Sequence, residues 1–289
     1  MVIEKNKTLH LVMVPFRGVG LDFRDDEWFA QRIEIFKNYT LKSLHNQTNQ
    51  DFVLWLSFRP QDRHNPLVLE LMGEIKHRAI FTFDGLMYWD DKFGGGFKQI
   101  IKNVGRVIRG WWRGQMKLSY AFYLLKNPNK TLADRLKNSL AYIEQIYGNP
   151  DKVLMTRIDS DDMFANRAME VVRGFYLDYP NRQAICLQKG FIYNTTTREL
   201  AQWNPQSNPP FYTLVFDREV FFNSPKHLEF YGDFKSHEDI PKQFEHCSSL
   251  RYDRFYCVTT SDPKLHTSTN WNHPFRGKIV DKELLKNFI

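Results

Sequence analysis

The stretch Val153-Leu154-Met155-Thr156-Arg157-Ile158-Asp159-Ser160-Asp161-Asp162 joins an apolar run to three carboxylates within four residues. It follows a turn, Gly148-Asn149-Pro150-Asp151, so residues 153–158 are expected to form a buried central strand with the acidic cluster at its C-terminal end. Carboxylates this close repel one another unless a cation lies among them, and Mg²⁺ and Mn²⁺ prefer such oxygen ligands. Because open α/β sheets bind ligands at the C-terminal ends of their strands, the stretch predicts a metal site that receives a phosphorylated ligand.

Strand-like and helix-like patterns alternate around this stretch. Apolar runs predict further strands at residues 8–16, 52–58, 79–83, 184–193, 211–216 and 255–260, the last of them being the final strand. Helical periodicity predicts helices at residues 28–44, 66–77, 131–147 and 166–179. Residues 194–210 are expected to form a polar, proline-rich loop.

The alternation predicts an α/β fold with a mixed, mostly parallel central sheet flanked by helices and a Rossmann-like nucleotide-binding half. We find no internal repeat and no low-complexity linker, so one domain is expected over residues 1–289. Its donor half would span residues 1–165, including an inserted basic helix, and its acceptor half residues 166–289.

Composition narrows the class of protein. Hydrophobic residues make up 42% of the 289 residues and aromatic residues 15%, which excludes a disordered chain. No apolar run approaches the ~20 residues that a membrane span needs, and residues 1–7 lack the apolar core of a secretory signal. Cys186, Cys247 and Cys257 show no CxxC spacing and are expected to be reduced core thiols. These features favour a cytoplasmic protein, with peripheral attachment to a membrane as an open alternative.

Positive charge is concentrated in one segment. Nine Lys or Arg residues and no Asp or Glu lie between Lys92 and Thr131. The charge of this segment, +9, exceeds the net charge of the whole chain, +7. Six of them recur every three or four residues and predict one basic face on an amphipathic helix at 97–118, opposite its apolar residues: Lys98, Lys102, Arg106, Arg109, Arg113 and Lys117.

Three interpretations of this helix stay open. It packs its apolar face on the core, it lies on a membrane surface with its basic face at anionic headgroups, or it holds an acceptor that carries phosphates. Nucleic acid is disfavoured as a partner, because Trp111 and Trp112 lie on the wrong side of the helix for base stacking.

Several segments resemble known proteins. A nucleotide-binding half-sheet followed by Asp159-Ser160-Asp161 resembles the glycosyltransferase-A (GT-A) architecture with its Asp-x-Asp motif. Within it the chain resembles the rhamnosyltransferases in the following segments: Phe16-Arg17, Arg32-Ile33-Glu34-Ile35-Phe36, Tyr39-Thr40-Leu41, Ser43-Leu44, Gln47-Thr48-Asn49-Gln50-Asp51-Phe52 and Thr156-Arg157-Ile158-Asp159-Ser160-Asp161-Asp162. Leu265-His266-Thr267-Ser268-Thr269-Asn270 is similar to that family's histidine-containing end segment, with Thr267 in place of the expected glycine. Residues 92–130 have no counterpart in this resemblance.

The resemblance implies a hexosyltransferase that moves a sugar, with rhamnose as a candidate, from a UDP-, dTDP- or GDP-sugar to a glycan or lipid-linked acceptor. A bound Mn²⁺ or Mg²⁺ would stabilise the charge on the departing nucleoside diphosphate. Asp161 is then the first candidate for direct metal coordination, and Asp159 would hold the ribose or a metal-bound water. Asp162 would ligate the metal or bond a neighbouring backbone group, and His266 is the candidate second protein ligand.

Other residues are candidates for donor contacts. Arg17 and Arg157 flank the acidic cluster, and guanidinium groups suit a diphosphate. Arg157 precedes Asp159 by two residues, so in a strand both face the same side, and Arg157 could serve instead as its ion-pair partner. Ser57 and Asp84 end two predicted strands and could meet the nucleoside or cap a strand end.

An inverting transfer, which we favour, needs a base to deprotonate the acceptor. Glu238 and Asp239 are the candidates, with Asp233 behind them, and a solvated acidic loop is the alternative interpretation of this segment. A retaining transfer would need no such base.

Two other classes of function stay open. One is a non-catalytic module with a nucleotide-sugar fold that binds a membrane or polyanion through its basic helix. The other is a metal-dependent nuclease or phosphatase, which normally needs more acidic ligands than the one strong cluster found here.

Overall fold

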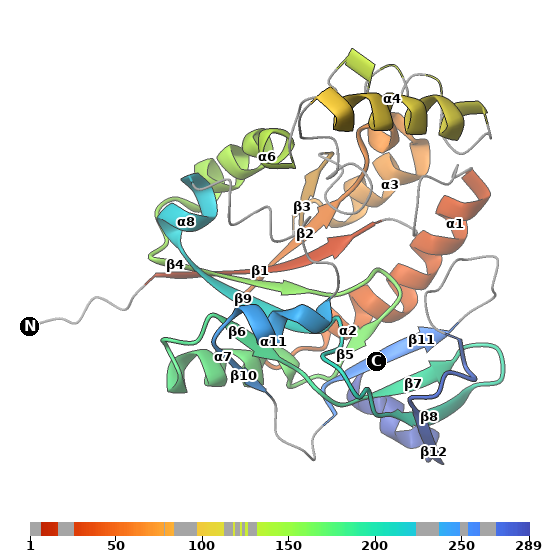
Figure 1. Ribbon diagram of the computed structural model, residues 1–289. Coiled ribbons are helices and arrows are strands. Elements are labelled where there is room, and N and C mark those ends of the chain that lie inside the picture. The colour runs from red at the N-terminus through yellow and green to blue at the C-terminus, as the bar shows by residue number, and fades with distance from the viewer. Residues whose placement is uncertain are drawn as a thin grey trace, which may run out of the picture.

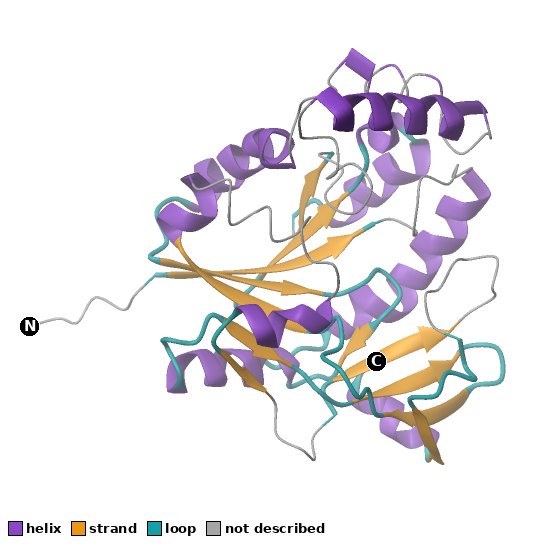
Figure 2. Ribbon diagram, viewed as in Figure 1, coloured by secondary structure: helices purple, strands orange, loops and turns teal. Residues whose placement is uncertain are grey.

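The computed structural model describes residues 7–16, 26–77, 79–83, 97–112, 118, 122, 125–126, 132–223, 237–248, 254–260 and 270–289. It shows a central sheet with helices on both faces and a second, smaller sheet beside it (Figure 1; Figure 2). Among these residues no helix is both long enough and apolar enough to cross a membrane.

The elements up to the acidic cluster are β1 (Thr8–Pro15), α1 (Asp26–Ile35), the π-helix η1 (Phe36–Leu41), α2 (Lys42–His45), β2 (Val53–Ser57), η2 (Pro60–His64), α3 (Pro66–Ile75), β3 (Ala79–Thr82), α4 (Phe97–Trp112), α6 (Leu132–Tyr147) and β4 (Lys152–Arg157). Those after it are β5 (Met163–Phe164), α7 (Ala168–Asp178), β6 (Ala184–Cys186), β7 (Gly190–Asn194), β8 (Glu199–Trp203), β9 (Tyr212–Asp217), α8 (Arg218–Asn223), η4 (His237–Asp239), α11 (Ile240–Gln243), β10 (His246–Ser248), β11 (Tyr256–Thr260), β12 (Arg276–Val280) and η6 (Lys282–Asn287).

The central sheet has seven strands in the order β10-β6-β9-β4-β1-β2-β3. β1 pairs in parallel with both β2 and β4, and β2 pairs in parallel with β3. Only β9 runs against its neighbours, β4 and β6. The predicted α/β fold with a mixed, mostly parallel sheet is therefore confirmed.

Strand β1 is buried on both faces. Val12 and Val14 lie in a core shared with α1, α3 and α7, whereas Leu11 and Met13 lie in a second core shared with α6 and α8. Alternate side chains of a strand point to opposite faces, so a continuous apolar run is what a strand between two helical layers requires.

The smaller sheet, in the order β12-β8-β7-β11-β5, differs from the sequence predictions, which also did not include β5. The single strand predicted at 184–193 is wrong, because β6 joins the central sheet and β7 joins the smaller one. The loop predicted at 194–210 contains β8, which forms a hairpin with β7. The strand at 255–260 is not the last, because β12 follows it and pairs with β8.

Candidate active site

The acidic cluster lies where the order of strands reverses. From β1 the chain adds β2 and β3 on one side, and then returns to place β4 on the other side of β1. Such a reversal leaves a crevice at the C-terminal ends of the two central strands, which is where open α/β sheets bind ligands. Asp159 follows β4 at this end, and a turn from Asp162 N–H to Asp159 O (3.1 Å) shapes the cluster. The residues Asp159 to Asp162 are called the acidic turn below.

Asp161 forms a buried ion pair with Arg32 of α1. Arg32 donates from Nη2 to Oδ1 (2.8 Å) and from Nη1 to Oδ2 (3.0 Å), and its Nε donates to Ser160 Oγ (2.8 Å). All three side chains are buried. This fork geometry is the strong form of an arginine–carboxylate contact. The direct coordination of a cation predicted for Asp161 would therefore require Arg32 to release at least one oxygen.

Asp162 is also buried, and β11 holds it from the other side. Its Oδ1 accepts a hydrogen bond from Thr259 N–H (3.1 Å), while the Thr259 hydroxyl donates to Asp161 O. Burial raises the pKa of Asp162 well above its usual value, and the charges of Asp161 and Asp159 raise it further. Of the two roles predicted for Asp162, the contact to a neighbouring backbone group is the one observed.

Asp159 is the carboxylate of the acidic turn that reaches solvent, with 27% of its side chain exposed. Its Oδ1 accepts a hydrogen bond from Arg157 Nη2 (2.9 Å), so the ion pair considered for Arg157 is present. Arg157 itself is buried. A ligand that approaches the acidic turn from solvent would meet this pair before it met the buried Asp161 or Asp162.

The 3₁₀ helix η4 brings a second set of polar groups to the acidic turn. Burial and the nearby Arg157 lower the pKa of His237, while the carboxylates of Glu238 and Asp159 act in the opposite direction. His237 O accepts a hydrogen bond from Asn208 Nδ2 (3.0 Å), and the exposed Glu238 accepts one from Ser207 Oγ (2.7 Å). His237 is therefore near enough to Arg157 and Asp159 for their charges to act on its ring.

Of the remaining predicted site residues, the structure describes the side chain of Ser57 alone. Ser57 is fully buried at the end of β2, where its backbone oxygen accepts from Phe16 N–H (2.8 Å). Arg17, Asp84 and His266 lie outside the described residues, as does Asp233, and the side chain of Asp239 is not described. Within the described part of the chain, no three His, Cys, Asp or Glu side chains form a group that could hold a metal ion.

Sequence reasoning gave no role to Arg32, Thr259 or His237. A signal existed for Arg32, because it follows Trp28 by four residues and so lies on the apolar side of its helix, where an arginine needs a buried partner. His237 stood next to the predicted base without being assigned a function. Thr259 carries no local signal, because its role depends on the approach of β11 to the acidic turn.

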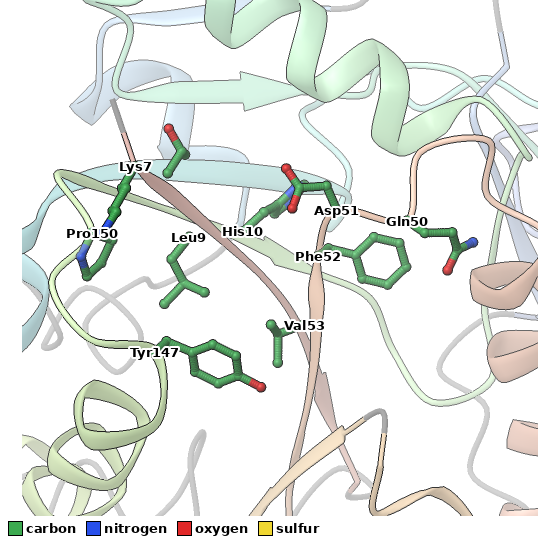
Figure 3. Close-up of a pocket in the computed structure, with 10 residues that line it drawn as sticks. Lys7, Leu9, His10, Gln50, Asp51, Phe52, Val53, Tyr147 and Pro150 are labelled. Carbon is green, nitrogen blue, oxygen red and sulfur yellow. The ribbon is translucent and has the colours of Figure 1, made fainter. Parts of the chain in front are cut away.

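A cavity of about 360 Å³ lies at the opposite end of the strands. Figure 3 shows it lined by Lys7, Leu9 and His10 from the start of β1, by residues 50–53 before and within β2, and by Tyr147 and Pro150. Because this is the N-terminal end of β1 and β2, the cavity does not share an edge with the acidic turn.

Comparison with known proteins gives one family match. Residues 23–80, which hold α1, η1, α2, β2 and α3, match the family model described as "Putative rhamnosyl transferase". A search among curated proteins returned no match.

Solved structures provide more distant similarities. TarS of S. aureus (residues 1–349) has a TM-score of 0.41 and 14% identity, over 87% of this chain and 60% of that chain. A longer TarS structure has a TM-score of 0.39 and 12% identity, over 88% of this chain and 37% of that chain. A nucleotide-diphospho-sugar transferase from Desulfovibrio desulfuricans G20 has a TM-score of 0.35 and 10% identity, over 85% of this chain and 80% of that chain. The chain thus spans less than two thirds of either TarS structure. Its resemblance to the rhamnosyl transferase family is confirmed by the family match over residues 23–80.

Proposed function

We propose that this chain is a glycosyltransferase that moves a sugar from a nucleoside diphosphate to a hydroxyl group of an acceptor. The observation that carries the proposal is the position of the acidic turn at the reversal of strand order, where the partly exposed Asp159 accepts a hydrogen bond from the buried Arg157. The family match over residues 23–80 supports the same class of reaction and makes rhamnose the first sugar to test.

Asp159 is the residue we propose for contact with the donor. Both oxygens of Asp161 accept from Arg32, and Asp162 is buried under Thr259, so the acidic turn offers one open carboxylate. That carboxylate suits a ribose hydroxyl or a divalent cation, with His266 as the predicted second ligand. Mn²⁺ or Mg²⁺ bound there would supply charge stabilisation for the departing diphosphate. Arg157, positioned by its bond to Asp159, would add a fixed positive charge next to the diphosphate.

Glu238 is the described candidate for the base that deprotonates the acceptor. It is exposed, and its carboxylate accepts a hydrogen bond from Ser207 Oγ, which holds it in position to take a proton from an incoming hydroxyl. Asp239 is the second candidate from the same segment. A base at Glu238 and a donor contact at Asp159 would supply the two roles that an inverting transfer needs.

The donor can be identified by thermal shift with dTDP-, UDP- and GDP-sugars, each with and without Mn²⁺. A ligand that binds the native state raises the unfolding temperature by mass action, so the largest shift names the nucleotide. Turnover is then followed as release of nucleoside diphosphate, with candidate acceptors added. Absence of any shift or turnover with all three donor classes would reject the proposal.

Asp159→Asn is the decisive variant, because Asp159 is partly exposed and asparagine keeps an oxygen that can accept the hydrogen bond from Arg157 Nη2. We expect at least a ~100-fold loss of kcat with little change in unfolding temperature. Asp178→Asn, an exposed aspartate at the end of α7, is the matched control and should keep full activity. Full activity in Asp159→Asn would contradict the assignment. Glu238→Gln tests the base in the same way, with the exposed Glu70→Gln on α3 as its control.

A further inference from the structure

Helix α4 carries a row of apolar side chains that the fold does not bury. Ile101, Ile108, Trp111 and Trp112 are 57%, 51%, 45% and 86% exposed, whereas Val107 is buried. Ile108 and Trp112 follow Ile101 by seven and eleven residues, so the three lie along one side of the helix over ~16 Å. They are called the apolar row below, with Trp111 at its margin. Helix α4 lies at the outer end of the molecule, at the top of Figure 1.

The arrangement decides among the interpretations left open by the sequence. If the apolar side of α4 simply packed on the core, Ile101, Ile108 and Trp112 would be buried with Val107. Instead Val107 is buried while the apolar row faces solvent. Beyond α4, Leu118 and Phe122 are also exposed, at 48% and 57%. Large apolar side chains gathered in this way on a folded protein mark a surface that binds another protein or a membrane.

The positive charge of residues 92–131 indicates which kind of partner this surface binds. Residues 92–131 contain nine Lys or Arg residues and no Asp or Glu, and Arg109 of α4 is exposed. A second copy of this chain docked on the same row would bring two strongly basic segments together, which is unfavourable. A nucleic-acid backbone would satisfy the charge but would leave the aliphatic side chains without an apolar partner. An anionic bilayer satisfies both, because its headgroups attract Lys and Arg while its interface accepts Trp and Ile.

We propose that α4 is a membrane-docking helix that lies in the plane of an anionic lipid surface with the apolar row inserted at the interface. Docking through α4 would hold the enzyme next to acceptors that are carried by the membrane. The proposal stands on the exposure and charge of α4 alone, so it does not depend on the proposed glycosyl transfer.

Flotation of the whole protein with lipid vesicles tests the proposal. We expect the wild-type protein to float with phosphatidylcholine vesicles that contain phosphatidylglycerol, and to stay behind with phosphatidylcholine alone. Binding should weaken as salt is raised, because the attraction between Lys or Arg and the headgroups is screened. Failure of the wild-type protein to float with the anionic vesicles would overturn the proposal, whatever its activity on nucleotide sugars.

Two variants separate the apolar and the charged contributions. Ile108→Ser combined with Trp112→Ser should lower the partition coefficient by roughly tenfold or more, because it removes two inserted side chains. Replacing Lys98, Lys102, Arg106 and Arg109 with Gln should lower it by roughly a hundredfold or more, since each basic residue near an anionic surface contributes about a fivefold change. Leu177→Ser on α7, where the leucine is 66% exposed, is the matched control and should float like the wild type.

A local readout connects binding to the helix itself. Lipids with brominated acyl chains should quench the tryptophan fluorescence of the wild-type protein on binding. The variant Trp111→Phe with Trp112→Phe should still float but should lose most of this quenching, because phenylalanine inserts without contributing tryptophan fluorescence. Equal quenching in both proteins, or wild-type flotation in both variants of the preceding paragraph, would overturn the assignment to α4. A dimer that forms through the apolar row, with no flotation, would likewise overturn it.

Discussion

Replacement of Arg32 should destabilise the protein far more than replacement of an exposed arginine. Arg32→Ala removes the only cation that contacts Asp161 in the described structure, where it makes two bonds to the carboxylate and one to Ser160. Both Arg32 and Asp161 are buried, so solvent cannot take the place of the lost donors. Breaking a buried ion pair from one side leaves an uncompensated charge and costs about 3–5 kcal/mol.

Urea unfolding, followed by circular dichroism, measures this loss as a shift of the midpoint at unchanged slope. Arg167→Ala is the matched control, because Arg167 is 64% exposed and pairs with Glu170 on the surface. Removal of such a surface pair should change stability by about 1 kcal/mol or less. Arg32→Lys keeps the charge but loses the fork, so it should lie between the wild type and Arg32→Ala.

The double variant Arg32→Met with Asp161→Leu makes the test specific to the pair. Replacement of both partners by apolar side chains removes the uncompensated charge. The double variant should therefore be more stable than Arg32→Met alone or Asp161→Leu alone. A coupling of about 1.5 kcal/mol or more is expected, because the two side chains are in direct contact. If Arg32→Ala unfolds at the same urea concentration as Arg167→Ala, Asp161 is not held by Arg32, and its role as a structural anchor is refuted.

Further predictions concern a buried histidine, a glycine and a carboxylate whose pKa is raised by burial. Burial, with a smaller effect of Arg173, lowers the pKa of His10 from 6.5 to about 3, so only the unfolded chain takes up this proton between those values. Stability should fall by about 1.4 kcal/mol per pH unit as the pH drops through this window, and His10→Gln should remove that part of the slope in urea unfolding. At Gly190 an added Cβ would lie 2.6 Å from the carbonyl oxygen of Tyr256, so Gly190→Ala should destabilise by about 1–3 kcal/mol, and a wild-type midpoint would contradict this. The raised pKa of Asp162 means that its stabilising contribution is greatest below its unfolded pKa and is lost as the pH rises through its folded pKa. Asp162→Asn should therefore be at least as stable as the wild type at neutral pH, and its stability should decline less as the pH rises from acid.

The central sheet could be predicted from the sequence because its signals are local. β1, β2 and β4 are buried on both sides, and each appears as a mainly apolar stretch of strand length. The smaller sheet lacks such signals. β12 contains Arg276 and Lys278 and has no buried residue, so its only mark is its pairing with β8. Residues 184–193 are predicted as one strand, although Gln188-Lys189-Gly190 interrupts the apolar residues where the chain changes sheets.

The candidate site divides in the same way. The position of the acidic turn at the end of a strand follows from the sequence, because a buried run must end before three carboxylates. The roles of the three carboxylates do not follow, because they depend on which distant groups reach them. Arg32 lies 129 residues before Asp161, and Thr259 lies 97 residues after Asp162. The choice between a metal ligand and an ion-pair partner is therefore made by tertiary contacts that Asp-x-Asp spacing does not encode.

Those contacts also explain why Asp159 is the residue to which we assign chemistry. The acidic turn is fixed by Arg32 from α1, by Thr259 from β11 and by the pairing of β4 with β1. Burial of a carboxylate is unfavourable unless the carboxylate is paired or hydrogen-bonded. Asp161 and Asp162 are buried and have such partners in Arg32 and Thr259, and these contacts hold the turn in one conformation. The third, Asp159, is partly exposed to solvent, and its hydrogen bond from Arg157 sets its orientation. Loss of activity in an Asp161 variant would consequently mix folding with catalysis, whereas Asp159→Asn separates them: its activity should fall while its unfolding midpoint stays close to that of the wild type.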